Sequence, residues 1–180
     1  MFKFEEIPLA NALLLTLPAF EDNRGIFIKN FQESIFKSNG IDFELRESYF
    51  SVSSKNVIRG MHFQLPPHDH AKIVFCPQGS ILDVLVDLRK ASPTFGKCFS
   101  AILSAENHKA FYIPSGFAHG FQSLEDNTIT YYLVSSEHHK ESDSGILYNS
   151  FGMEWQTDAP VMSERDLSFP SLAQWPGGFE

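Results

Sequence analysis

The chain has 180 residues, and 43% hydrophobic with 20% charged residues is an ordinary composition for a globular protein. Its formal net charge of −8 argues against nonspecific binding to nucleic acid or anionic membranes, and no run of about 20 apolar residues is present to span a bilayer. A chain of this length is expected to fold as one domain, residues 1–180, with a sizeable core.

The first apolar stretch, LANALLLTLPAF at residues 9–20, follows Glu5 and Glu6 in place of a basic region. We therefore expect a strand here and not a signal peptide. Both cysteines, Cys76 and Cys98, lie in strand-like runs without CxxC spacing. They are expected to be buried free thiols in a reducing compartment, which predicts a cytoplasmic protein.

Strand-like runs recur along the chain with turn residues between them. Strands are expected at residues 13–17, 25–31, 47–54, 57–63, 72–76, 81–88, 97–103, 109–113, 128–134 and 146–148. One short helix is expected over residues 32–39, closed by Gly40, and the tail from Pro160 is rich in Pro, Ser and Gly. About ten short strands at spacings of about 8–12 residues predict an all-β jelly-roll barrel or sandwich with a few short helices. An α/β fold would need helices of about 10–15 residues between the strands, and the pattern contains none.

The stretch from Val57 to Lys72 places two cations and a titratable imidazole on adjacent extended segments. Arg59, His62 and Lys72 together suit an anionic ligand that bears a carbonyl group. The ordinary alternative is that Arg59 and Lys72 are solvated charges at a sheet edge and that His62 is a satisfied core histidine. This stretch alone leaves both interpretations open.

Arg59 and His62 face opposite sides of the sheet if the strand that contains them is regular. Both can face one cavity only if the register shifts between them, and Gly60 permits a bulge there. We therefore predict a bulge or kink at Gly60–Met61. A regular strand through residue 64 would leave either Arg59 or His62 outside the pocket.

Three side chains have the chemistry for proton transfer next to a carbonyl group. His62 suits a general base because imidazole titrates near neutral pH, and Lys72 can stabilise an oxyanion. The period of the strand at 128–134 places Tyr132 on its more polar face, with Thr128 and Thr130, and we take this face to line the cavity. A phenol there suits proton donation, although an ordinary strand tyrosine is the alternative.

The segment IPSGFAHGF at residues 113–121 resembles the second half of the cupin pattern and projects His119 from a strand start. The first half of a metal cupin supplies two histidines and a glutamate. Here His68-Asp69-His70 imitates the two histidines, but residues 71–76 contain no glutamate. The pattern therefore favours a solvated loop over a metal site.

Several longer segments of this chain match, in the same order, segments that are found together in one protein family. They are DNRGIF (22–27), NVIRGMHFQ (56–64), KIV (72–74), DVLVDLRKASPTFGK (83–97), LSAEN (103–107), IPSGFAHGF (113–121), YY (131–132), LYNSFGMEW (147–155) and MSERD (162–166). With these, the chain resembles the dTDP-4-dehydrorhamnose 3,5-epimerases over nearly its whole length. That family consists of metal-free cupins of deoxysugar pathways, including dTDP-rhamnose biosynthesis for cell-surface polysaccharides. The resemblance implies an isomerase without metal or other cofactor, a nucleotide-linked 4-keto-6-deoxy sugar as substrate, and a homodimer with exchanged N-terminal strands.

The resemblance also implies a role for each catalytic candidate. His62 matches the catalytic base, and Asp166 matches the carboxylate that is paired with it. Tyr132 matches the proton donor on the opposite face of the sugar ring. Lys72 matches the residue near the C4 keto oxygen, with His119 close by.

Further candidates match residues that bind the substrate. Arg24 and Arg59 match residues that hold the nucleotide diphosphate. Asp143 stands where the family has a glutamate, and Arg165 stands where it has a lysine. Because the N-terminal strands are exchanged in the family, some of these residues are expected to serve the partner's site.

Four departures from the family pattern fall among the ligand contacts. Lys29 replaces a glutamate, Glu47 and Tyr49 replace Gln and Asn, and His138 replaces the aromatic residue that stacks on thymine. Since the chemical residues are kept, our hypothesis is that catalysis is retained and the ligand is altered. The ligand would then differ in its nucleotide or its keto-sugar, or only one carbon would be epimerised. The plain alternative is neutral drift with dTDP kept.

The main functional prediction is therefore epimerisation at C3 and/or C5 of a nucleotide-linked 4-keto-6-deoxy sugar through an enolate. The alternatives are a single-carbon epimerase and a ketoisomerase, which uses the same base but moves the carbonyl group. A metal-dependent cupin oxygenase and a non-catalytic sugar-binding cupin are weaker alternatives from other functional classes.

Overall fold

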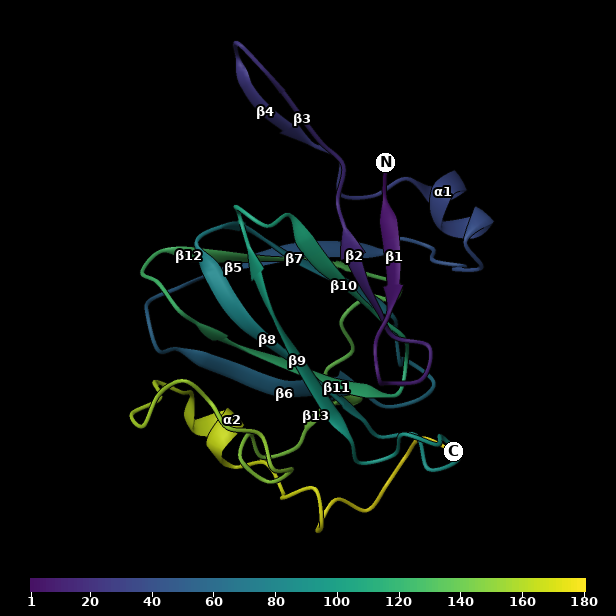
Figure 1. The fold of residues 1–180 in the computed structure, drawn as a ribbon. Helices are drawn as coiled ribbons and strands as arrows, with labels where there is room; N and C mark the ends of the chain where they lie inside the picture. Colours follow the sequence, from purple (N-terminus) through teal and green to yellow (C-terminus); the bar gives the residue numbers. More distant parts are fainter.

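Two antiparallel sheets pack face to face in the computed structural model, which describes residues 1–180 (Figure 1). The larger sheet has six strands in the order β1 (Lys3–Glu6), β2 (Leu13–Thr16), β10 (Lys109–Ile113), β7 (Lys72–Gln78), β12 (Thr128–Val134) and β5 (Glu47–Ser53). The smaller sheet has five strands in the order β13 (Asp143–Gly145), β6 (Ile58–Gln64), β11 (Phe117–Ser123), β8 (Ser80–Asp87) and β9 (Cys98–Ser104). Most neighbouring strands are distant in the sequence, as the connections of a jelly roll require.

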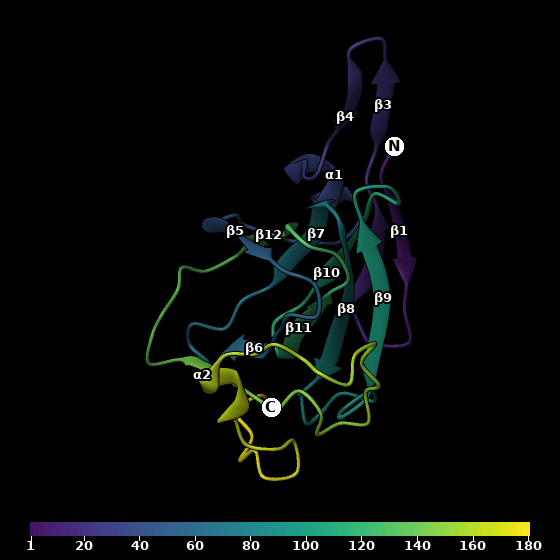
Figure 2. The same cartoon turned by 90° about the vertical axis from the view of Figure 1, so that its left-hand side faces the viewer.

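A hairpin and two short helices complete the structure. The hairpin is formed by β3 (Ala19–Asp22) and β4 (Gly25–Ile28) and projects away from the two sheets (Figures 1 and 2). Helix α1 (Glu33–Ser38) packs against the six-stranded sheet, and helix α2 (Glu164–Leu167) lies beside β6. Neither helix has the length or the apolar surface needed to cross a bilayer.

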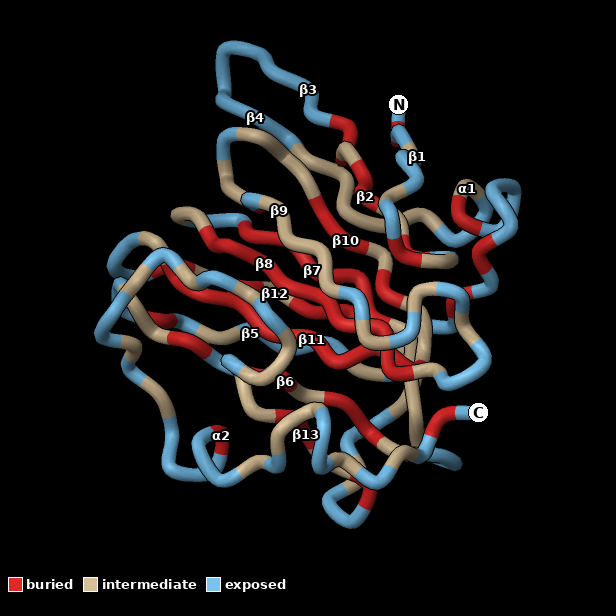
Figure 3. The backbone as a smooth tube through the Cα atoms, turned by 60° about the horizontal axis from the view of Figure 1, so that its bottom comes forward, coloured by how far each residue is buried: buried red, intermediate tan, exposed pale blue.

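Three layers of buried apolar side chains stabilise the sheets. The central layer lies between the sheets and includes Val74, Leu85 and Phe121. Phe36 belongs to a second layer, which α1 covers, and Phe63 to a third, which the C-terminal tail covers. Buried backbone is concentrated in the two sheets, whereas the projecting hairpin is exposed (Figure 3). Each fully buried large apolar side chain contributes about 1.5–3 kcal/mol, so these layers fix how the sheets face each other.

Helix α1 confirms the helix expected over residues 32–39. Gly40 follows its end with a φ of 78°, the left-handed conformation that closes a helix at little cost for glycine. The helix is too short to be stable alone and depends on packing. Phe36, which is fully buried, makes edge contacts with the rings of Phe2 and Phe4.

The predicted irregularity at Gly60–Met61 is confirmed. Arg59 and His62 pair with β11 on either side of Gly120, so two residues of β6 face one residue of β11. Gly60 has a φ of 136°, and a Cβ atom there would lie 2.6 Å from the Cα atom of Gly120. Only glycine fits this close approach. The bulge turns both Arg59 and His62 toward one pocket.

The all-β prediction is confirmed, and every expected strand is present except the run at residues 146–148. The strand in that region is β13, which ends just before the run. Sequence analysis missed β1, β3 and α2, and for β11 it expected only a strand start near His119. The missed strands are rich in charged residues, such as Glu5 and Glu6 in β1. Pairing with neighbouring strands, which local sequence does not reveal, overrides their weak strand propensity.

Candidate active site

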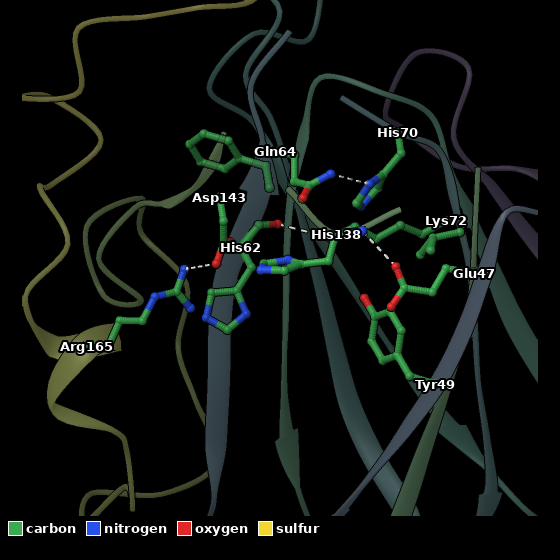
Figure 4. Close-up of a pocket in the computed structure, with 11 residues that line it drawn as sticks. Glu47, Tyr49, His62, Gln64, His70, Lys72, His138, Asp143 and Arg165 are labelled. Atoms are coloured by element: carbon green, nitrogen blue, oxygen red, sulfur yellow. Dashed lines mark hydrogen bonds and ion pairs between the residues drawn. The ribbon is translucent and has the colours of Figure 1, made fainter. Parts of the chain in front are cut away.

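A pocket of about 330 Å³ lies where both sheets approach helix α2 (Figure 4). Its lining residues are Glu47, Tyr49, His62, Phe63, Gln64, His70, Lys72, Val134, His138, Asp143 and Arg165. The site candidates from the sequence among them are Glu47, Tyr49, His62, Lys72, His138, Asp143 and Arg165. Strands β5, β7 and β12 come from one sheet and β6 and β13 from the other, so a ligand in this pocket would be contacted from two sides.

His62 and Asp166 form an acid–base pair at the wall of this pocket. The Nε2 atom of His62 lies 2.8 Å from Oδ1 of Asp166. The Asp166 side chain is buried, whereas 31% of the His62 side chain is exposed. The Asp166 carboxylate accepts a hydrogen bond, so Nε2 carries the proton of the neutral imidazole. Nδ1 then has a free lone pair and can accept a proton from the substrate. This is the arrangement of a general base with an orienting carboxylate.

Asp166 is held in place by backbone geometry at the start of α2. Ser163 caps the helix, because its Oγ atom accepts a hydrogen bond from the Asp166 N–H at 3.1 Å. The N–H of Gly60 donates to Oδ2 of Asp166, also at 3.1 Å. Burial raises the pKa of Asp166, but hydrogen bonds from His62 and Gly60 outweigh this effect and lower the pKa below its ordinary value. The carboxylate therefore stays ionised at neutral pH.

Lys72 lies at the start of β7 and is buried. Its Nζ atom donates a hydrogen bond of 3.2 Å to the backbone oxygen of His62. Burial lowers the pKa of Lys72 to about 8, and the negative charges of Asp143 and Asp83 oppose this shift. The ammonium group is thus mostly protonated at neutral pH and poorly solvated, which suits it to stabilise a developing oxyanion.

A second histidine–aspartate pair lies deeper between the sheets. The Nε2 atom of His119 lies 2.9 Å from both carboxylate oxygens of Asp83, and both side chains are buried. Burial raises the pKa of Asp83 and lowers the pKa of His119, and each partner opposes the shift of the other. Sequence analysis missed Asp83. An acidic residue inside the apolar run ILDVLVDL is the signal that could have identified it.

Tyr132 faces the interior of the barrel, as its strand period predicted. Thr128, Thr130 and Tyr132 are all buried on the same side of β12. The Tyr132 ring stacks on that of Tyr49, with centroids 4.8 Å apart, and meets the imidazole of His119 edge-on at 5.9 Å. Tyr49 lines the pocket, and Tyr132 contacts the pocket wall through it.

The protonation of Tyr132 follows from its surroundings. Burial raises the pKa of Tyr132 well above its ordinary value, and the negative charge of Asp83 adds to the shift. The phenol therefore keeps its proton across the physiological pH range. A neutral phenol in this place is a proton donor and not a base.

Arg59, on β6, forms hydrogen bonds to the nearby end of β5. Its Nε atom donates to Ser53 Oγ at 3.1 Å, and its Nη2 atom donates to the backbone oxygen of Val52 at 3.4 Å. Arg59, His62 and Arg165 contribute to a second pocket of about 350 Å³. Two cations therefore stand close to the imidazole, where an anionic group of a ligand would be stabilised.

Two candidates lie away from the pocket in this chain. Arg24 is at the tip of the projecting hairpin and pairs with Asp22 at 2.5 Å. Lys29 follows β4 and donates to Gln32 Oε1 at 3.1 Å. Neither side chain lines the pocket around His62.

The other three departures from the family pattern lie together. Glu47, Tyr49 and His138 line the pocket, and the Glu47 carboxylate accepts a 2.7 Å hydrogen bond from the backbone N–H of His138. This bond ties the loop after β12 to the edge strand β5. The departures therefore form one wall, and only Lys29 is distant from it.

The prediction of a solvated loop at His68-Asp69-His70 is wrong. These residues are half-buried, because the loop packs against the loop after β12. The ring of His68 stacks on that of His139 at 3.5 Å, and His70 lines the pocket. Gln64, which sequence analysis also missed, joins the two loops: its amide donates to the His68 carbonyl and accepts from the His139 N–H. No group of three or more His, Cys, Asp or Glu side chains is arranged to hold a metal ion.

The fold and the site together define a jelly-roll enzyme with groups for proton transfer. A family model described as dTDP-4-dehydrorhamnose 3,5-epimerase matches residues 6–174. The chain therefore belongs to the dTDP-4-dehydrorhamnose 3,5-epimerase family, whose members are isomerases. The family predicted from the sequence motifs is confirmed.

Known proteins of this kind cover nearly the whole chain. A dTDP-4-dehydrorhamnose 3,5-epimerase of Sinorhizobium fredii is 38% identical over 98% of this chain and 93% of its own. The dTDP-6-deoxy-D-glucose-3,5-epimerase of Legionella pneumophila, solved with dTDP-4-keto-L-rhamnose, is 31% identical with a TM-score of 0.92, covering 97% of this chain and 94% of its own. A 3'-monoepimerase of Streptomyces bikiniensis, solved with dTDP-quinovose, is 31% identical with a TM-score of 0.88, covering 94% and 87%. These similarities confirm the cupin-type jelly roll.

Proposed function

We propose that this protein epimerises C3 and C5 of a dTDP-linked 4-keto-6-deoxy sugar, of the dTDP-4-dehydro-6-deoxyglucose type. The observation that carries the proposal is the placement of acid and base on opposite sheets. His62, with its carboxylate partner, is on β6 of the five-stranded sheet, and Tyr132 is on β12 of the six-stranded sheet. The named ligands of the Legionella and Streptomyces relatives support the class of substrate.

The chemistry begins with removal of a proton next to the keto group. The C4 carbonyl acidifies the C–H bonds at C3 and C5. The free Nδ1 of His62 takes one of these protons, and the ionised Asp166 stabilises the imidazolium that forms. The electron pair of the broken C–H bond moves into an enolate whose negative charge lies on the C4 oxygen.

The enolate is stabilised by the buried cation, and the phenol completes the inversion. Lys72 donates to the C4 oxygen, with His119 nearby. Tyr132 then returns a proton to carbon from the face opposite to His62, which inverts the configuration. General acid–base groups of this kind each contribute about 10²–10⁴-fold to the rate.

The nucleotide end of the substrate is assigned to the cationic side of His62. Arg59 would hold the diphosphate. Arg24 and Lys29 would contribute from a second copy of the chain, as a homodimer with exchanged N-terminal strands. The hairpin supports this assembly, because Phe20, Ile26 and Phe27 are each more than half exposed on it. A single-copy mass by light scattering at working concentration would contradict the dimer.

We also propose that the chain works as one domain in the cytoplasm. Both sheets share the central apolar layer, and Cys76 and Cys98 are free thiols, which supports a reducing compartment. Cys76 is buried as expected, whereas Cys98 is only half-buried. Limited proteolysis that releases a stable fragment would contradict the single domain.

A single-carbon epimerase or a changed nucleotide is the second candidate. It is favoured by the wall of Glu47, Tyr49 and His138, whose side chains differ from the family pattern, and by the fold shared with a 3'-monoepimerase. Titrations with dTDP, GDP, CDP and UDP decide the nucleotide. If dTDP binds far more tightly than GDP, CDP and UDP, a changed nucleotide base is ruled out.

Solvent deuterium uptake tests the proposed reaction. The protein is incubated in D₂O with dTDP-4-keto-6-deoxyglucose, and deuterium at C3 and C5 is measured by NMR. Uptake at both carbons, lost in His62→Ala, is the expected result. Uptake at one carbon would establish the single-carbon alternative, and uptake at neither would overturn the function for this substrate.

A further inference from the structure

The segment of residues 163–170, here called the tail strap, crosses β13 and β6 at the edge of the five-stranded sheet. It contains α2, whose single turn cannot be stable alone, so its position depends on contacts with the sheet. The strap bears Asp166, the partner of His62. Whatever fixes the strap therefore also fixes the distance between Asp166 and His62.

An ion pair joins the strap to β13. The Nη2 atom of Arg165 donates to Oδ2 of Asp143 at 2.7 Å, where the Arg165 side chain is 46% exposed and that of Asp143 is 25% exposed. The Nη1 atom of the same guanidinium lies 3.9 Å from Oδ1 of Asp166, the oxygen that contacts His62. Figure 4 shows the ion pair of Arg165 with Asp143 of the edge strand. The same arginine thus also lies near the carboxylate of the acid–base pair.

An aromatic contact joins the same arginine to His62. The guanidinium carbon of Arg165 lies 5.0 Å above the ring of Phe169, and that ring meets the imidazole of His62 edge-on at 5.8 Å. Phe169 fits against Gly145, where a Cβ atom would overlap its ring. Gly145 is also the residue of β13 that pairs with His62. Arg165 is therefore connected to His62 by two contacts, one through Asp166 and one through Phe169.

We propose that the Asp143–Arg165 ion pair is a clamp that positions Asp166 and His62 for proton abstraction. The inference rests on the proposed epimerase function and goes beyond it. The resemblance to the family assigns both residues to substrate binding, whereas the contacts here connect them to the base. Asp143 and Arg165 are then positioning residues, whose effect is on the rate of proton transfer more than on substrate affinity.

The lengths of the two side chains make the clamp testable. Asp143 is the shorter acid and Arg165 the longer base, and Asp143→Glu with Arg165→Lys exchanges the lengths while preserving both charges and the combined reach. Either substitution alone changes the reach of the pair. A misplacement of about 1 Å can cost up to about 10²-fold in rate, so the single variants should be impaired and the double variant should recover.

The experiment compares the wild type with Asp143→Glu, Arg165→Lys and the double variant. Glu33→Asp/Lys37→Arg, which makes the reverse exchange of lengths in an exposed ion pair on α1, is the matched control. Each single variant should lower kcat about tenfold with KM changed less than about twofold, and the double variant should return to within about threefold of wild type. The control should match wild type. A rise in KM with unchanged kcat, or a double variant whose loss is the product of the single losses, would overturn the clamp.

A measurement without substrate separates failure of the clamp from failure of the proposed function. The ring N–H proton of His62, hydrogen-bonded to Asp166, is followed by NMR in the same proteins. The resonance should shift or broaden in each single variant and return in the double variant, even if no 4-keto sugar is turned over. Phe169→Leu, which removes the aromatic contact, should shift it as well. An unchanged resonance in the single variants and Phe169→Leu would overturn the clamp, whereas an inactive wild type would overturn only the function.

Discussion

Two histidine–aspartate pairs lie side by side in this protein, and they are held in opposite ways. His62 and His119 are direct partners in the pairing of β6 with β11, and each contacts a carboxylate at 2.8–2.9 Å. Asp166 lies on a short tail helix, its carboxylate accepts a hydrogen bond from the Gly60 N–H of β6, and its pKa is lowered. Asp83 is fixed by burial inside a central strand, and its pKa is raised.

The difference shows how one pair of residue types can serve two purposes. Hydrogen bonds to the charged form keep Asp166 ionised, so the half-exposed His62 can take up a proton and be stabilised as imidazolium. Burial penalises charge on both members of the Asp83–His119 pair, so this pair suits a fixed polar surface beside Tyr132 and Lys72. We therefore expect the first pair to dominate the rate and the second to contribute more to stability.

The largest expected effect is that of removing the base. His62→Ala should reduce kcat by about 10³-fold or more, because His62 is the one histidine lining the pocket whose imidazole contacts a carboxylate. The free energy of unfolding should change little, since His62 is partly exposed. Steady-state kinetics and urea unfolding measure the two effects. Activity above about one tenth of wild type would place the base elsewhere.

The next effect comes from the carboxylate of the same pair. Asp166→Asn keeps the shape but removes the charge that stabilises imidazolium, so kcat should fall about 10²-fold. Because its pKa is lowered, the ionised Asp166 adds to the free energy of unfolding at pH values above the ordinary aspartate pKa, and this contribution disappears as the pH falls through the folded pKa. Asp166→Asn should lack this pH-dependent contribution. Acid unfolding curves of wild type and variant should therefore converge at low pH. Equal stability at neutral pH would contradict the assignment.

Asp83→Asn removes the carboxylate charge of the buried Asp83–His119 pair and so tests the second pair. The substitution leaves His119 with a weaker partner in a dry environment, so the free energy of unfolding should fall by about 1–3 kcal/mol. The rate should fall about tenfold, less than for Asp166→Asn, because Asp83 acts through His119 and not on the base. Chemical denaturation and kinetics on the two variants test the order. A reversed order would show that the buried pair is the one used for proton abstraction.

The smallest effect concerns the pH dependence due to Lys72. Its pKa of about 8 predicts that kcat declines above about pH 8, as the ammonium loses its proton. Lys72→Arg, although less active, should lose this basic limb because arginine stays charged. The free energy of unfolding should change in the opposite direction. Between about pH 8 and the ordinary Lys pKa of 10.5, Lys72 is protonated in the unfolded chain but not in the folded one, so its contribution to stability rises with pH. A basic limb that is identical in Lys72→Arg would assign it to another group.

Sequence reasoning succeeded where local pattern decides the structure. Alternating apolar residues predicted β12 with the correct bounds, including the inward face of Tyr132. The requirement that Arg59 and His62 share a pocket predicted the bulge at Gly60 before the register was known. In these places one physical constraint, the period of two or the lack of a Cβ atom, leaves few alternatives.

Sequence reasoning failed where the outcome depends on tertiary contacts. Nothing local places Asp166 beside a histidine 104 positions away, and only the family resemblance indicated the pair. Helix α2 was missed because its single turn is stabilised by the sheet. The loop of His68 to His70 was taken as solvated, since its partner is a second loop brought near by Gln64. Such contacts follow from the fold and cannot be seen in short segments.

The most direct test of the account compares exchange with inversion in two variants. In D₂O with dTDP-4-keto-6-deoxyglucose, Tyr132→Phe should still incorporate deuterium at C3 or C5 with the starting configuration, because His62 removes and returns the proton on one face. His62→Ala should show neither exchange nor inversion. Deuterium uptake that persists in His62→Ala, or inversion that proceeds at the wild-type rate in Tyr132→Phe, would contradict the assignment of base and acid to opposite sheets.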